Sequence, residues 1–132
     1  RPPKRSSYGI NDIKGLKLLT RLRVEFSDLR SHRFNHNFNC VSPVCICNIE
    51  EEDNSHYFLR CPRFNQSRNN LLSNISKVIG SDISILPSEH LCNIILYGSN
   101  IYNDITNKLI LRETLEFIRK SERFKILEVF ST

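Results

Sequence analysis

The stretch that organises this sequence is residues 43–62, PVCICNIEEEDNSHYFLRCP. It places three cysteines and one histidine in the order Cys45-x-Cys47-x8-His56-x4-Cys61. Three thiolates and one imidazole complete the tetrahedral shell of a closed structural zinc site. The Cys-x-Cys turn can supply two of the ligands, and the segment that returns after the spacer can supply the other two. We therefore predict a structural Zn2+ ion held by Cys45, Cys47, His56 and Cys61.

Alternatives to this ligand set remain open at the level of sequence. The first pair is Cys-x-Cys rather than the commoner Cys-x2-Cys, so the thiols could instead be free and partly buried, with His56 at the surface. Cys40 could replace one of the first two cysteines of the motif, and His32 and His36 lie four residues apart, as two ligands at a helix end would. Cys92 lies among apolar neighbours, so we expect it to be a core thiol.

Periodicity predicts helices on both sides of this motif. In four stretches the apolar residues recur at spacings of three and four, which is typical of an amphipathic helix. These stretches run from a cap at Asn11 or Asp12 to Ser31–Phe34, from Pro62 to Gly80, from Pro87 to Gly98, and from Asp104 to Ser121.

The segment between the first two of these helices lacks helical periodicity. Pro43 and the acidic turn after Ile49 bracket two short apolar runs, at residues 44–49 and 57–59, which favours a small hairpin. We therefore expect a mainly α fold: about four helices with a small zinc-knuckle-like β-hairpin between the first and the second. The predicted domain is residues 10–132, with the zinc-binding hairpin at 40–62. Residues 1–9, RPPKRSSYG, are expected to form a basic extended arm or linker.

Composition fits a single globular domain. Leu, Ile, Val and Phe account for 43 of 132 residues, which argues against a disordered chain. The longest apolar run, residues 91–97, is much shorter than the roughly 20 residues that span a bilayer, and no signal peptide is visible. We therefore expect an intracellular protein, nuclear or cytoplasmic, with no membrane partner and with cysteines that bind metal rather than form disulfides. Because the chain starts at Arg1 and contains no Met, we also expect a fragment of a longer protein.

No catalytic set is visible in the sequence. It has no Gly-rich phosphate loop, no G-x-S-x-G motif and no adjacent pair of Asp residues that could hold two polymerase metals. The acidic run Glu50–Asp53 is better interpreted as a solvated turn than as a cation site. A Cys61–His56 nucleophile pair would be consumed by zinc ligation and has no orienting third group. We expect no catalytic residue in this chain.

Several stretches resemble a known family. Residues 15–24 (GLKLLTRLRV) and 29–38 (LRSHRFNHNF) resemble the segment that follows the polymerase domain in LINE-type (non-LTR, jockey-like) retrotransposon reverse transcriptases. Residues 43–47 and 55–62 resemble the zinc-binding CCHC segment of that family, and residues 96–99 and 117–124 resemble its final helices. One departure is Asn48, where relatives often have Gly. Asn tolerates the left-handed conformation that such a turn needs.

The resemblance implies that the parent protein is an RNA-directed DNA polymerase, which copies element RNA into DNA at a nicked target. The polymerase carboxylates of the family lie upstream of the matched part, so this chain is expected to be an accessory region that does not polymerise. The implied partners are RNA or DNA, or both, and the upstream polymerase domain.

Charge suggests where nucleic acid would bind. The net charge is +5, but residues 1–39 carry +6, residues 40–56 carry −4 and residues 57–80 carry +4. We expect phosphate contacts from the basic residues of the first third and of the segment around Cys61. These are Lys4, Arg5, Lys14, Lys17, Arg21, Arg23, Arg60, Arg63 and Arg68.

Two aromatic residues beside His56, Tyr57 and Phe58, could stack an unpaired base. Packing of the zinc segment on the helices is the favoured alternative for them. A rival function is a structural, protein-interaction zinc module that braces the polymerase thumb without touching nucleic acid.

Overall fold

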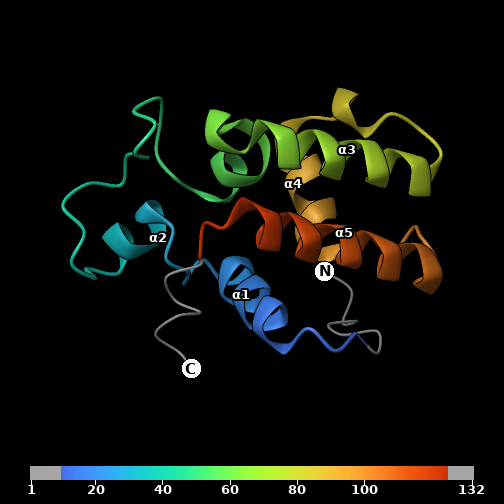
Figure 1. Cartoon of the computed structure of the whole chain (residues 1–132), viewed down its shortest axis with the longest axis horizontal. Coiled ribbons are helices and arrows are strands. Elements are labelled where there is room, and N and C mark those ends of the chain that lie inside the picture. The colour runs from blue at the N-terminus through green and yellow to red at the C-terminus, as the bar shows by residue number, and fades with distance from the viewer. Residues whose placement is uncertain (1–9, 125–132) are drawn as a thin grey trace.

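The computed structural model describes residues 10–124 and is mainly helical (Figure 1). The predicted basic arm at residues 1–9, with Lys4 and Arg5, lies outside the described residues. The α-helices are α1 (Ile13–Arg23), α2 (Arg30–Asn35), α3 (Asn65–Ile79), α4 (Ser88–Tyr97) and α5 (Asp104–Ser121). A π-helical turn at His56–Arg60 and short 3-10 turns at Pro62–Phe64 and Ile83–Ile85 complete the regular structure.

The three later helices match the stretches predicted from periodicity, and their ends have clear causes. Pro62 begins a 3-10 turn that leads into α3, and Gly80 ends α3 with a φ of +87°, a conformation that Gly adopts without strain. Helix α5 begins after Asn103, whose side chain accepts a hydrogen bond of 2.8 Å from the Thr106 N–H.

The first predicted helix is wrong in its length. Helix α1 ends at Arg23, and six residues separate it from the short helix α2. Glu25 has a φ of +57°, and the Leu22 carbonyl accepts a hydrogen bond of 2.8 Å from the Asn54 amide. Asn54 belongs to residues 45–61, which carry the predicted ligands and which we call the metal segment, so this segment donates to a carbonyl at the last turn of α1. Phe26, an apolar residue of the stretch that was predicted to be helical, is 47% exposed.

The predicted β-hairpin at residues 40–62 is not supported either, because residues 10–124 contain no strand. The only β pairing in this described part of the chain is an isolated antiparallel bridge between Val44 and Glu51. The expected return strand at 57–59 lies in the His56–Arg60 turn. The consecutive residues Tyr57 and Phe58 of this turn are both fully buried in the same core, whereas a strand would send their side chains to opposite faces.

Helix α5 is central to the core and packs against α3, α4 and α1 (Figure 1). Tyr57 contacts Phe117 of α5 edge to face at 5.2 Å, and its hydroxyl lies 2.7 Å from Ser121 Oγ. Tyr57 and Phe58 thus anchor the metal segment to the helices, so the packing alternative is confirmed and base stacking by these two rings is excluded. No helix within residues 10–124 has an apolar stretch long enough to cross a membrane.

Candidate metal centre

The four predicted ligands lie together. The ligand atoms of Cys45, Cys47, His56 and Cys61 are all within 4.8 Å of one another. The Sγ atoms of Cys45 and Cys61 are 3.8 Å apart, and Cys47 Sγ is 3.3 Å from His56 Nε2. Two sulfurs bonded at 2.3 Å to one tetrahedral zinc would be separated by about 3.8 Å. The cluster is therefore compact enough that it could hold a single metal ion.

Two tight backbone turns bring the ligands together. In the first, the Asn48 N–H donates to the Cys45 carbonyl at 2.8 Å, and Asn48 has a φ of +65°. This is the left-handed conformation that made Asn an acceptable residue at that position. In the second, the Cys61 N–H donates to the His56 carbonyl at 2.8 Å, so one turn places His56 and Cys61 at its two ends.

Glu50 orients the histidine. Its Oε2 lies 2.8 Å from His56 Nδ1, which leaves Nε2 facing the sulfurs. A carboxylate behind a ligating imidazole fixes the tautomer and ring orientation of the histidine at many metal sites. The Arg60 guanidinium donates to the same oxygen at 2.7 Å, and this bond, with the one to His56, holds the pKa of Glu50 below its usual value.

Arg63 contacts two of the three thiols. Its Nε donates to Cys61 Sγ at 3.3 Å and its Nη2 to Cys45 Sγ at 3.2 Å. Burial raises the pKa of Cys45 to about 11. Burial acts in the same direction on Cys61, but hydrogen bonds and charge from Arg63 outweigh it and lower the pKa of that thiol. A metal ion would deprotonate the cysteines that it binds.

The acidic run is only partly the solvated turn expected from sequence, because Glu51 is exposed whereas Glu52 is buried. Glu52 is 1% exposed, and its carboxylate accepts hydrogen bonds from Arg63 at 2.9 Å and from Arg123 at 2.8 Å. The Arg30 N–H donates to it at 2.8 Å. Burial alone would raise the pKa of Glu52, but these donors hold it below its usual range. Sequence reasoning missed this residue because Arg123 lies 71 positions away along the chain.

The alternative ligands are occupied elsewhere. Cys40 Sγ lies 3.1 Å from the Ser42 carbonyl, and His32 Nδ1 lies 2.7 Å from Ser27 Oγ. His36 packs its ring on Phe26, with centroids 4.2 Å apart. None of these residues belongs to the cluster. Cys92 is buried, as expected for a core thiol.

Four of the predicted phosphate-binding arginines make contacts within the protein. Arg68 is 6% exposed and donates to the carbonyls of Phe58 and Cys61. The Nε of Arg23 donates to the Leu96 carbonyl at 2.6 Å, and its guanidinium lies over the Tyr97 ring. The other two are Arg60 and Arg63, which pair with the acidic run beside the metal centre.

Lys14, Lys17 and Arg21 are placed differently. All three are exposed on α1, at positions i, i+3 and i+7, which share one helix face. No ion pair joins them to another residue in the described part of the chain. We call these three residues the α1 basic stripe.

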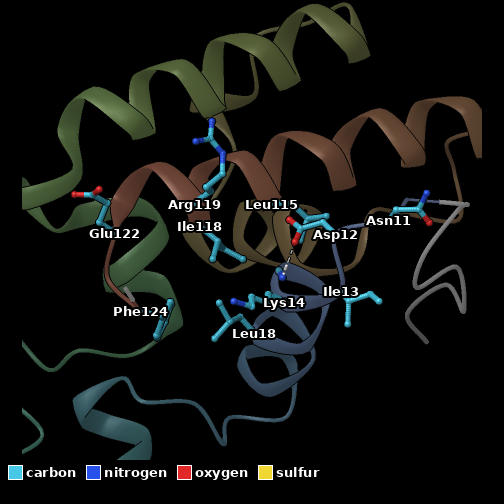
Figure 2. A pocket seen from close by; sticks show the side chains of 11 residues that line it. Asn11, Asp12, Ile13, Lys14, Leu18, Leu115, Ile118, Arg119, Glu122 and Phe124 are labelled. Carbon is cyan, nitrogen blue, oxygen red and sulfur yellow. Dashed lines mark hydrogen bonds between the residues drawn. The ribbon is translucent and has the colours of Figure 1, made fainter. Parts of the chain in front are cut away.

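One end of this stripe borders a pocket of about 450 Å³ between the start of α1 and the end of α5 (Figure 2). Lys14 and Arg119 line it together with Asp12 and Glu122, and Leu115 and Ile118 supply apolar wall. Asp12 also caps α1 there, accepting a bond of 2.9 Å from the Gly15 N–H. The pocket has mixed charge and shares no residue with the metal cluster.

Comparison with protein-family models, curated proteins and solved structures finds no match for this chain. The resemblance to reverse transcriptases therefore stays a prediction, and the function has to be argued from the metal centre and the surface.

Proposed function

We propose that this chain is a non-catalytic, zinc-binding accessory module of a LINE-type retrotransposon reverse transcriptase. The observation that carries the proposal is the convergence of the Cys45, Cys47, His56 and Cys61 ligand atoms within 4.8 Å, with Glu50 behind the imidazole. Three sulfurs and one nitrogen would fill every position of a tetrahedral zinc ion. No position remains for water or substrate, which is the donor set of a structural site.

The ion would act by cross-linking two segments that have little regular structure of their own. It would join the Cys45–Asn48 turn to the His56–Arg60 turn, and the second of these carries Tyr57 and Phe58 into the core. The apparent binding free energy of structural zinc in small domains is about 10–16 kcal/mol at neutral pH, so the ion would contribute to folding directly.

We further propose that the α1 basic stripe contacts the phosphate backbone of RNA or DNA. Its three side chains are exposed on one helix face and have no acidic partner among residues 10–124. Each phosphate that such a side chain neutralises releases counterions, so binding would weaken as salt rises.

The rival proposal, a module that braces the polymerase thumb, also has an observation in its favour. Arg23, Arg60, Arg63 and Arg68 are engaged inside the protein, so much of the positive charge predicted for nucleic acid has a structural role. The two proposals differ on one measurement, which is whether the chain binds single-stranded RNA at low salt.

Zinc content tests the metal site. We expect one zinc ion per chain in purified protein by elemental analysis, and loss of that ion in Cys47→Ser. Cys40→Ser is the matched control, because Cys40 lies outside the cluster, and it should retain the metal. Purified protein without zinc, with all five thiols reactive to a titrant, would contradict the proposal.

RNA binding tests the stripe. Fluorescence anisotropy with a short single-stranded RNA, at about 50 and about 200 mM salt, should show salt-sensitive binding. Lys17→Glu with Arg21→Glu should weaken that binding without unfolding the protein. Lys77→Glu with Arg112→Glu, an equal charge change at exposed positions of α3 and α5, is the control. No binding by the unaltered chain at low salt would favour the thumb-bracing module.

A further inference from the structure

A second pocket, separate from the metal cluster, gathers arginines that the sequence analysis did not select. It lies between α2 and the end of α5 and has a volume of about 400 Å³. Arg30 and Arg33 of α2 line it from one side, and Arg123, which follows α5, lines it from the other. Asn39 and Phe124 add a polar and an apolar wall. Three guanidinium groups from two distant parts of the chain thus share one concave site.

These guanidinium groups are held in place before any ligand arrives. Arg123 donates to both oxygens of the buried Glu52 at 2.8 Å and to the Asp28 carbonyl at 2.9 Å. Arg33 donates to the Asp28 carboxylate at 3.2 Å. Arg30 donates through Nε to the Val44 carbonyl at 2.6 Å. Because the side chains are already ordered, a ligand would not have to immobilise them.

The pocket retains donors for an anion. Asp28 is the single acidic residue that lines it, against three arginines. Within residues 10–124, Arg30 uses only its Nε and Arg33 only one Nη1 bond, so their remaining N–H groups have no protein acceptor. Guanidinium forks match the geometry of phosphate oxygens and bind them bidentately, which makes phosphate the ligand that this donor set fits best.

Aromatic side chains next to α2 indicate where that phosphate would come from. Phe26, His36 and Phe38 form a cluster with ring centroids 4.2–6.0 Å apart, and both Phe rings are more than 40% exposed. The Phe38 N–H donates to the Arg33 carbonyl at 2.8 Å, so this aromatic cluster is attached directly to the helix that carries Arg30 and Arg33. Exposed aromatic rings beside guanidinium groups are the combination by which proteins hold single strands, through base stacking and backbone charge.

We propose that the Arg30–Arg33–Arg123 pocket binds a backbone phosphate of a single-stranded nucleic acid, whose neighbouring base stacks on the Phe26–His36–Phe38 cluster. This rests on the proposed nucleic-acid function and adds a defined site to it. The α1 basic stripe supplies charge along the helix, whereas the pocket supplies one fixed, bidentate contact.

RNA binding by pocket variants tests the proposal in the zinc-loaded chain of residues 1–132. Arg33→Gln and Arg30→Gln should each lower the affinity for a short single-stranded RNA several-fold and reduce the salt slope by about one unit. Phe38→Ala should lower the affinity while leaving the salt slope unchanged, because a ring carries no charge. Arg112→Gln, an exposed arginine of α5 outside this pocket, should change affinity less than either pocket variant.

A direct readout separates this proposal from the proposed function. In the folded, unaltered protein, RNA should shift the arginine side-chain NMR signals of Arg30, Arg33 and Arg123. If charge reversal on α1 weakens RNA binding but the pocket variants and these signals do not respond, the pocket is overturned and the proposed function stands. If inorganic phosphate shifts the three signals and RNA does not bind, the site takes free phosphate, and the nucleic-acid proposal for the pocket is overturned.

Discussion

At the scale of single residues, Glu50 determines which nitrogen of His56 faces the sulfurs. Its carboxylate is 2.8 Å from Nδ1, and the same oxygen accepts from Arg60. Glu50→Gln removes the negative charge behind the imidazole and is expected to weaken zinc binding by about 10–100-fold, the usual effect of losing such a partner. Competition with a chromophoric chelator measures this change.

Glu51→Gln is the matched control, since Glu51 is exposed and has no side-chain contact with the cluster. It should bind zinc as tightly as the unaltered chain. Equal zinc affinity of the Glu50 and Glu51 variants would show that Glu50 does not orient the histidine.

His32 is a buried residue whose titration should be visible in stability. It is 2% exposed, and burial is the main cause that lowers its pKa. The unfolded chain, with a histidine pKa of about 6.5, therefore binds the proton more readily than the folded one. The contribution of neutral His32 is complete above about pH 6.5 and is lost as pH falls, by up to about 1.4 kcal/mol per pH unit.

Urea unfolding at several pH values measures that loss against His32→Asn, which keeps an acceptor near the Nδ1 position that meets Ser27. Zinc release in acid affects both proteins alike and cancels in the difference. The variant should lose less stability than the unaltered chain between pH 6.5 and the lower folded pKa. Parallel pH profiles would mean that His32 titrates normally in the folded protein.

The ligands were accessible to sequence reasoning because their spacing is local. All four lie within 17 residues, and donor chemistry restricts what such a set can do. The contacts around them were not accessible in the same way. Arg63 was assigned to phosphate and instead contacts two sulfurs. Glu52 pairs with Arg123 only after the chain has passed through six more helices or helical turns.

At the scale of elements, the start of α1 combines two opposing preferences. Asp12 caps the helix through the Gly15 N–H, and a Cβ on Gly15 would lie 2.3 Å from an Asp12 carboxylate oxygen. Gly15→Ala should gain about 1 kcal/mol of helix propensity and lose a cap of about 1 kcal/mol, so its net effect on unfolding is close to zero.

A double-mutant cycle by urea unfolding separates the two effects. Asp12→Ala alone should cost about 1 kcal/mol, and adding Gly15→Ala to it should recover about 1 kcal/mol. A Gly15 substitution that has the same effect in both backgrounds would show that Asp12 and Gly15 do not compete for the same space.

The elements that periodicity predicted well are those stabilised by their own apolar stripe and end residues, as Gly80 and Asn103 illustrate. The errors arose where a group distant in the sequence determined the backbone conformation. At the end of α1, the Asn54 amide donates to the Leu22 carbonyl. Tyr57 and Phe58 are both buried in the core, so a turn forms where the sequence suggested a strand.

At the scale of the whole molecule, Glu52 is the junction between the metal segment and the helices. It receives hydrogen bonds from the start of α2, from Arg63 beside the metal centre and from Arg123 after α5. The segment that carries the candidate metal ligands and the end of the chain's last described helix are thereby connected through one buried carboxylate. Loss of these hydrogen bonds should therefore destabilise the whole domain and not only the residues around Glu52.

Arg123→Met and Arg119→Met test that role with two arginines four residues apart. Arg123 pairs with Glu52, which is 1% exposed, whereas Arg119 pairs with Glu116 at the surface, where the two side chains are 65% and 42% exposed. Removing Arg123 leaves a buried carboxylate with fewer donors and should lower the free energy of unfolding by about 3 kcal/mol, while the surface change should cost less than about 1 kcal/mol. Urea unfolding with zinc in excess measures both free energies of unfolding without interference from metal loss.

Hydrogen exchange tests how far the effect of Arg123 extends. Because Glu52 accepts hydrogen bonds from three parts of the chain, the Arg123 variant should also speed hydrogen exchange in α3 and α5. If the two variants unfold alike, the buried Arg123–Glu52 pair contributes no more to stability than a surface ion pair does.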